Sequence, residues 1–140
     1  MRIALLLVGL LASPAADAAV KARFIDGVYV MSTEACDKLK ALAKGGTRSI
    51  GTVPWSVDRN GFDQWEGGCS FSRIRETAKG QSWSVTSFCE GNTPDENSTE
   101  SYVFKRVSPT TFAVTLTTPG ASAEQRQPKT YLRCDVPAKR

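Results

Sequence analysis

The sequence contains no histidine. Histidine is the commonest general base in enzymes, so its absence excludes serine–histidine and cysteine–histidine catalysis. The glycine-rich phosphate-binding motifs and the HExxH zinc motif are also absent. Three carboxylates, those of Asp58, Asp63 and Glu66, lie close together around one turn, and turn chemistry explains them better than an acid–nucleophile pair. We therefore expect neither a catalytic centre nor a bound cofactor or metal.

Long apolar runs are scarce as well. The run from Ile3 to Ala12 spans about 15 Å as a helix, which is roughly half of a bilayer core. Arg2 precedes this run and Ala16-Asp17-Ala18 follows it, which is the order of a secretory signal peptide and its cleavage site. We expect cleavage after residue 18, no membrane anchor, and a single exported domain of residues 19–140 that is periplasmic or secreted.

Clustered positive charge is a third feature that the sequence lacks. The net charge is +4, but the basic residues are scattered along the chain. Nucleic-acid-binding domains have a basic stripe with stacking aromatics, so we expect no nucleic-acid partner. Arg73 and Arg75 alternate with Ile74 and share one strand face. Ion pairs with acids on a neighbouring strand are the preferred interpretation, and an anion clamp is the alternative.

Four cysteines are present, Cys36, Cys69, Cys89 and Cys134, without a CxxC pair. An even number of cysteines beside an export signal favours two disulfides over a zinc site. The preferred pairing is Cys36–Cys69 with Cys89–Cys134, because it ties the helix and the last strand to the centre of the sheet. The rival pairing joins Cys69 to Cys89 across a turn at Lys79-Gly80 and leaves Cys36 for Cys134.

Turn residues recur about every eight to twelve positions, which is typical of a meander of short strands. One short helix is expected from Ser32 or Thr33 to about Ala43, before a basic and glycine-rich stop. We expect strands at 24–31, 49–57, 62 to the turn at 79–80, 82–89, 102–107, 112–116 and 131–135. About seven antiparallel strands with one N-terminal helix predict a mainly β fold that closes into a small barrel or a curled sheet.

The sequence Asp58-Arg59-Asn60-Gly61 is the strongest hairpin signal in the chain. Counting outward from a three-residue loop sets Trp55 opposite Trp65. Trp83 shares a strand face with Cys89. Packing in the core is the preferred role of the tryptophans, and a platform for a ligand is the alternative.

The longest polar stretch runs from Glu90 to Glu100 and is expected to be an exposed loop. Three of its acids, Asp95, Glu96 and Glu100, form the candidate partner-binding surface. Negative charge on a projecting loop favours a basic protein as the partner.

The layout of signal peptide, short β-barrel and disulfides resembles that of the periplasmic lysozyme inhibitors of Gram-negative bacteria. The resemblance covers the architecture alone, so no residue is assigned a role through it. It implies a non-enzymatic binding or inhibitory domain of the bacterial periplasm. The alternative is a small carrier that holds an apolar ligand inside the barrel, with some of the tryptophans lining a void.

Overall fold

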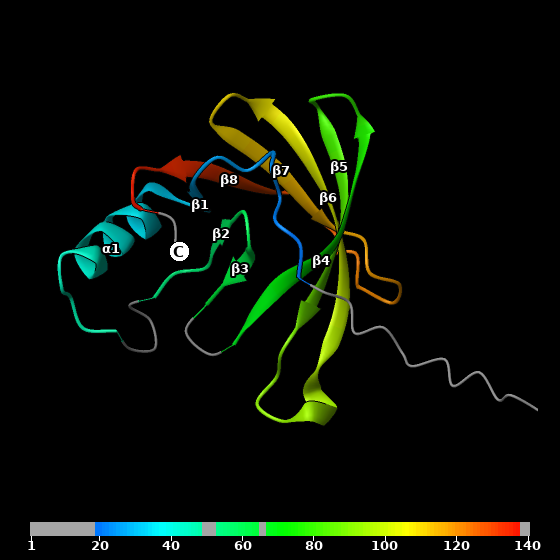
Figure 1. Cartoon of the computed structure of the whole chain (residues 1–140), viewed down its shortest axis with the longest axis horizontal. Coiled ribbons are helices and arrows are strands. Elements are labelled where there is room, and N and C mark those ends of the chain that lie inside the picture. Colours follow the sequence, from blue (N-terminus) through cyan, green and yellow to red (C-terminus); the bar gives the residue numbers. More distant parts are fainter. Residues whose placement is uncertain (1–18, 49–52, 65–66, 138–140) are drawn as a thin grey trace, which may run out of the picture.

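The computed structural model describes residues 19–48, 53–64 and 67–137, so the expected signal peptide, Trp65 and Glu66 lie outside the described residues. In the described part, eight antiparallel strands form a closed barrel in which each strand pairs with the next and the last pairs with the first (Figure 1). The strands are β1 Val28–Val30, β2 Ser56–Asp58, β3 Gly61–Asp63, β4 Gly68–Ala78, β5 Ser82–Cys89, β6 Ser98–Ser108, β7 Thr111–Leu116 and β8 Lys129–Cys134. The expected mainly β barrel with one short helix is confirmed.

The eighth strand results from a turn that the alternating pattern of the sequence does not indicate. The chain reverses between β3 and β4, and Phe62 pairs with Cys69 across the two strands. Gly67 lies in this reversal at φ +76°, and a Cβ atom at this position would lie 2.7 Å from the carbonyl oxygen of Glu90. Only glycine adopts this conformation easily. The segment expected as one strand from residue 62 is therefore two strands.

The β2–β3 hairpin is tighter than expected. Asp58 pairs with Gly61, so the loop contains only Arg59 and Asn60 rather than three residues. A carboxylate oxygen of Asp58 accepts a hydrogen bond from the backbone N–H of Asn60 at 2.7 Å, which is turn chemistry. This change of register removes the basis for placing Trp55 opposite Trp65.

The helix α1 spans Thr33–Ala43, as expected, and the hydroxyl oxygen of Ser32 caps its first turn. It packs on the outside of the barrel against β1 and β8 (Figure 1). Cys36 packs with Val30 beneath the helix, while Tyr29 is buried inside the barrel, so both faces of β1 are covered. Among the described residues, no helix is long and apolar enough to cross a membrane.

Two disulfides are present, as expected, but the preferred pairing is wrong. The bonds are Cys36–Cys134 and Cys69–Cys89. Cys69 and Cys89 are direct partners across β4 and β5. The packing of α1 against β8 brings the Cα atoms of Cys36 and Cys134 to 5.5 Å from each other. Two disulfides and no free cysteine indicate an oxidising location outside the cytoplasm.

Aromatic side chains fill the middle of the barrel. Phe71, Phe104 and Phe112 are fully buried, and Trp83 is 6% exposed, so the expected core role of Trp83 is confirmed. Side chains on each strand alternate between the interior and the outer face. The inward-facing residues of β6 run from one barrel end to the other in the order Arg106, Phe104, Tyr102, Glu100.

These residues distinguish the two ends of the barrel. We call the end at Arg106 the closed end; it lies beside the β4–β5 and β6–β7 turns. We call the end at Glu100 the open end; it lies beside the loop that joins β5 to β6. Figure 1 shows this loop projecting on the opposite side of the barrel from the two turns.

Candidate ligand-binding site at the open end of the barrel

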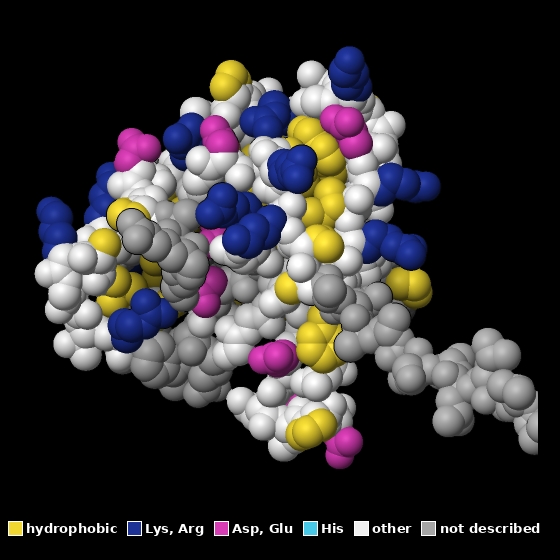
Figure 2. All heavy atoms as spheres, in the orientation of Figure 1, with side chains coloured by type: hydrophobic (Ala, Val, Ile, Leu, Met, Phe, Trp, Pro, Cys, Tyr) yellow, Lys and Arg dark blue, Asp and Glu magenta, His cyan; other side chains and the backbone are white. Residues whose placement is uncertain are grey.

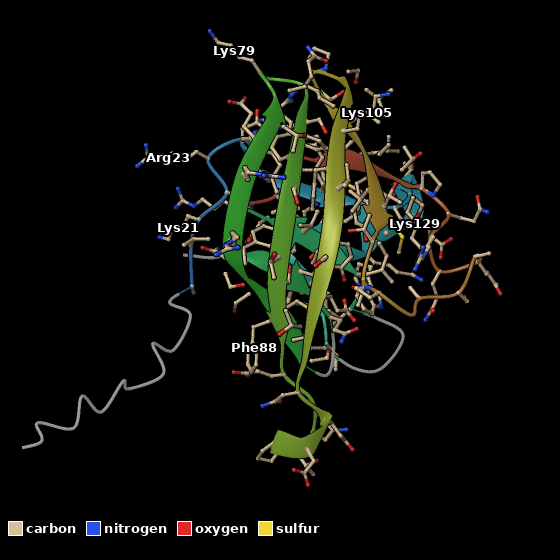
Figure 3. The ribbon with its side chains drawn as sticks, turned by 90° about the vertical axis from the view of Figure 1, so that its right-hand side faces the viewer. Lys21, Arg23, Lys79, Phe88, Lys105 and Lys129 are labelled. Carbon is tan, nitrogen blue, oxygen red and sulfur yellow. A yellow bond between two sulfur atoms is a disulfide. The ribbon has the colours of Figure 1, made fainter. Side chains whose placement is uncertain are left out.

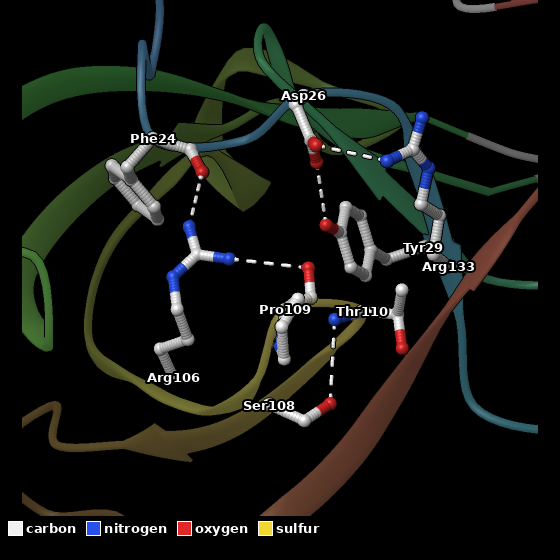
Figure 4. Close-up of polar contacts among 8 residues, drawn as sticks. All are labelled: Phe24, Asp26, Tyr29, Arg106, Ser108, Pro109, Thr110 and Arg133. Carbon is white, nitrogen blue, oxygen red and sulfur yellow. Dashed lines mark hydrogen bonds and ion pairs between the residues drawn. The ribbon is translucent and has the colours of Figure 1, made fainter.

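The N-terminal segment, residues 19–27, crosses the closed end and fills it. The ring of Phe24 stacks on Trp83 with a centroid distance of 4.2 Å and an interplanar angle of 5°. The guanidinium of Arg106 lies 4.6 Å from the ring centroid of Phe112. It donates hydrogen bonds to the backbone carbonyls of Phe24 at 2.9 Å and Pro109 at 3.4 Å (Figure 4). These contacts hold a cation at the closed end without any ligand.

An acid at the closed end is satisfied in the same manner. The hydroxyl of Tyr29 donates a hydrogen bond of 2.6 Å to Asp26, and Arg133 forms an ion pair of 2.9 Å with the same carboxylate (Figure 4). The hydrogen bond from Tyr29 and the charge of Arg133 lower the pKa of Asp26. Burial and the hydrogen bond to Asp26 raise the pKa of Tyr29 to about 12.

The open end is hollowed into a cup of about 370 Å³. This volume is within the range of small-molecule sites, which begins near 300 Å³. The rings of the lining are those of Trp55, Phe62, Tyr102 and Tyr131. The polar side chains of the lining are those of Glu100, Gln125, Gln127 and Lys129.

Trp55 is a large aromatic side chain that the barrel does not bury. It is 44% exposed and lines the cup together with Met31, which is 41% exposed. The core role expected for Trp55 is therefore wrong. An exposed aromatic side chain beside a hollow is typical of a binding surface.

Glu100 is the acid of the cup. It belongs to β6 rather than to the exposed loop expected from the sequence, and its partner across the sheet is the buried Ser87. Its carboxylate accepts a hydrogen bond from the hydroxyl of Tyr102. Burial and this hydrogen bond raise the pKa of Tyr102 above its usual range, and burial raises the pKa of Tyr131 to about 12. Both tyrosines are therefore neutral near pH 7.

The Cys69–Cys89 disulfide lies next to the acid of the cup. The two sulfur atoms and a carboxylate oxygen of Glu100 lie within 4.8 Å of one another. Metal ions bind thiolates, and the sulfur atoms of a disulfide have no thiolate character. While the disulfide is intact, this group offers a carboxylate and no metal site.

Asp95 and Glu96 lie apart from Glu100, in the loop that projects from the open end. They belong to the 3-10 turn Pro94–Glu96, and both are exposed. The carboxylate of Glu96 accepts a hydrogen bond from the backbone N–H of Asn92 at 2.9 Å, so it also organises the loop. In Figure 2 acidic side chains are visible on this lower projection. Of the three acids expected to bind a partner, Asp95 and Glu96 thus lie together in the loop, and Glu100 lies in the wall of the cup.

Comparison with known proteins gives no match: no family model fits the chain, and no curated protein or solved structure is significantly similar to it. Fold alone does not determine function, because one architecture carries many activities. The function is therefore argued from the residues of the site.

The expected ion pairs of Arg73 and Arg75 are wrong. Their partners across the sheet are Thr86 and Ser84, and neither arginine forms an ion pair within the described part of the chain. Several other cations lie toward the closed end of the barrel. Figure 3 shows three of them, Arg23, Lys79 and Lys105. These three cations lie toward the closed end, whereas Lys129 and the loop acids lie at the open end.

Most of the cup is not predicted by the sequence. No local pattern gives a role to Met31, Tyr102, Lys129 or Tyr131, because they lie in segments that are distant in sequence. One signal was present in the alternation along β6. The inward-facing residues change from Phe104 and Tyr102 to the charged Glu100 before the strand ends, which marks the place where a packed interior gives way to a polar one.

Proposed function

We propose that this chain is a non-enzymatic binding protein that holds a small ligand in the cup at the open end of its barrel. The observation that carries the proposal is a hollow of about 370 Å³ whose wall combines the exposed Trp55 with the half-buried Glu100. Small-molecule sites usually have aromatic or apolar walls with a few polar groups that orient the ligand.

The position of the cup refines the carrier hypothesis. Phe71, Phe104 and Phe112 occupy the middle of the barrel, so a ligand rests at the end rather than deep inside. An eight-stranded barrel has space either for its own side chains or for one small ligand. In this chain the closed half contains side chains and the open half offers space.

We propose that the domain acts in the periplasm or outside the cell, after removal of residues 1–18. The disulfides support an oxidising compartment, and the order of charge, apolar run and small residues in that segment supports export. The absence of histidine from the sequence supports binding rather than catalysis.

A fragment screen by NMR on isotopically labelled protein tests the proposal. We expect small aromatic compounds to shift the indole signal of Trp55, and Trp55→Ala to weaken their binding at least about tenfold. Phe88→Ala is the matched control, because Phe88 is 40% exposed but lies away from the cup lining, near the lower end of the barrel in Figure 3. A screen whose hits shift no cup residue, or lose no affinity in Trp55→Ala, contradicts the proposal.

A second candidate function is the binding of a basic protein by Asp95 and Glu96. The projection of this loop beyond the barrel favours it, since both acids are accessible to a large partner. Lysozyme is the probe that the architectural resemblance suggests. We expect inhibition of lysozyme by the wild-type domain and weaker inhibition by the double variant Asp95→Asn, Glu96→Gln. No inhibition by the wild-type domain contradicts this candidate.

A further inference from the structure

Glu100 is a charged group without a counter-ion in the wall of the cup. The residue is half-buried, and within the described part of the chain no lysine or arginine forms an ion pair with it. Tyr102 supplies one hydrogen bond. A carboxylate has about four lone-pair sites, so much of its accepting capacity is left over. Burying a carboxylate is costly unless it is paired, and this cost favours a cationic ligand.

The rings of the cup favour the same kind of ligand. The centroid of Phe62 lies 4.7 Å from that of Tyr102 and 6.3 Å from that of Tyr131, and Trp55 lines the same hollow. The face of an aromatic ring is negative, so it attracts a cation within about 6 Å. A wall of rings around one carboxylate therefore selects a cation that also has apolar surface.

Charged groups near the cup also bear on this preference. The loop acids Asp95 and Glu96 add negative potential at the same end. Lys129 also lines the cup, but it is exposed and forms no ion pair with Glu100, and the two loop acids at the same end offset its charge.

We infer that the cup binds an organic ammonium ion, an amine whose positive group meets Glu100 and whose apolar or aromatic body lies against Trp55 and Tyr131. This inference rests on the proposed function and adds the chemical class of the ligand to it. Charge-assisted hydrogen bonds to the carboxylate provide selectivity, and burial against the rings provides apolar contact.

Isothermal titration with three probes of matched shape tests the inference on the wild-type domain. The probes are phenethylammonium, the neutral phenethyl alcohol and the anionic 3-phenylpropionate. We expect the amine to bind roughly tenfold to a hundredfold more tightly than the alcohol, because hydrogen bonds to charged groups are the stronger ones. We expect the anion to bind more weakly than the alcohol. Added salt weakens binding of the amine and leaves binding of the alcohol unchanged.

A matched pair of variants assigns the preference to one residue. Glu100→Gln is expected to remove the preference for the amine while it retains binding of the alcohol. Glu76→Gln, at an exposed acid near the closed end, is expected to bind all three probes like the wild type. Circular dichroism checks that both variants fold. If a variant does not fold, the ratio of the wild-type affinities for the amine and the alcohol still tests the ammonium inference.

The outcomes separate the two proposals. Equal binding of amine and alcohol, or a preference that persists in Glu100→Gln, overturns the ammonium inference and leaves small-ligand binding in place. Failure of all three probes also overturns the ammonium inference, and small-ligand binding then depends on whether other fragments shift Trp55. If no compound shifts a cup residue, both proposals fail.

Discussion

At the closed end of the barrel Arg106 and Asp26 are held by groups of the chain itself, whereas at the open end Glu100 meets a single tyrosine hydroxyl. Aromatic rings are present at both ends. At the closed end the ring of Phe24 covers Trp83, while at the open end Trp55 is 44% exposed. The same kinds of side chain are therefore paired at one end and unpaired at the other.

The N-terminal segment accounts for this difference. Residues 19–27 supply Phe24 and Asp26 to the closed end, so that end receives its partners from its own chain. The cup is an accessible hollow among the described residues, and Glu100 in its wall forms no ion pair with a described lysine or arginine. The closed end, filled by its own chain, is structural, whereas the exposed ring of Trp55 and an acid without an ion pair at the open end support the binding proposed there.

The largest expected effect on the free energy of unfolding is that of removing a disulfide, and one disulfide lies toward each end of the barrel. Cys134 follows Arg133, whose guanidinium pairs with Asp26 at the closed end, and Cys69–Cys89 lies beside the cup. The sequence separations are 98 and 20 residues. In the chain-entropy model, replacing Cys36 and Cys134 by alanine costs about 4.7 kcal/mol and replacing the other pair costs about 3 kcal/mol. Urea unfolding of the two double variants measures the difference, and the reverse order contradicts the comparison.

The next effect tests the seal of the closed end. Phe24→Ala removes the stack on Trp83 and the edge contacts with Phe104 and Phe112. We expect a loss of about 3 kcal/mol in the free energy of unfolding, at the low end for a phenylalanine because Phe24 is partly exposed. Phe24→Leu, which retains apolar volume, should recover more than half of the loss. A change below about 0.5 kcal/mol contradicts the view that this residue seals the barrel.

Alkaline titration compares the tyrosines of the two ends. Burial raises the pKa of Tyr29 at the closed end and of Tyr131 at the open end to about 12, and that of Tyr102 further. A group whose pKa is raised by folding stabilises the fold below its unfolded pKa, and this contribution is lost as pH rises from about 10 to about 12. We expect phenolate absorbance and loss of circular dichroism to rise together above pH 10. Ionisation of some tyrosines before unfolding shows that solvent reaches the rings of the cup.

The smallest expected effect is that of Trp55→Ala on stability. An exposed side chain away from the core changes the free energy of unfolding by about 0.5 kcal/mol or less. The same variant is expected to lose ligand affinity, so Trp55→Ala affects binding more than stability, whereas Phe24→Ala lowers stability. Urea unfolding beside a binding titration measures both quantities. A loss of several kcal/mol shows that Trp55 supports the barrel.

Much of the fold is predictable from the sequence because its signals are local. Ser32 is the N-cap of α1, and the expected turn at Lys79-Gly80 joins β4 to β5. The alternation along β5 places Trp83 and Cys89 on the same buried face, as expected. The extra strand was missed because a glycine with positive φ, Gly67, leaves the alternating pattern unchanged while it reverses the chain.

The site and the disulfide pairing were less predictable because they depend on long-range contacts. The cup combines residues of β3, β6, β7 and β8 with the residue after β1, the segment before β2 and the loop between β7 and β8, and no local pattern relates Met31 to Tyr131. The pairing of Cys36 with Cys134 depends on α1 packing against β8, which follows only from closure of the barrel. Arg106 was assigned no contact with Phe24, since 82 residues separate them in sequence.

The two disulfides are nested, with the inner bond Cys69–Cys89 enclosed in sequence by the outer bond Cys36–Cys134. A chain delivered N-terminus first into an oxidising compartment presents Cys36 and Cys69 before the other two cysteines, so simple order of arrival favours a non-native bond. The native pairs form directly only if the β4–β5 hairpin places Cys69 opposite Cys89 before Cys69 is oxidised to a disulfide with Cys36. Hairpins close in microseconds, whereas disulfide formation is slow. The last bond must wait for β8, the final strand of the barrel. We therefore expect the yield of oxidative refolding in vitro to fall when a fast oxidant is used, and to recover when a thiol–disulfide isomerase is added.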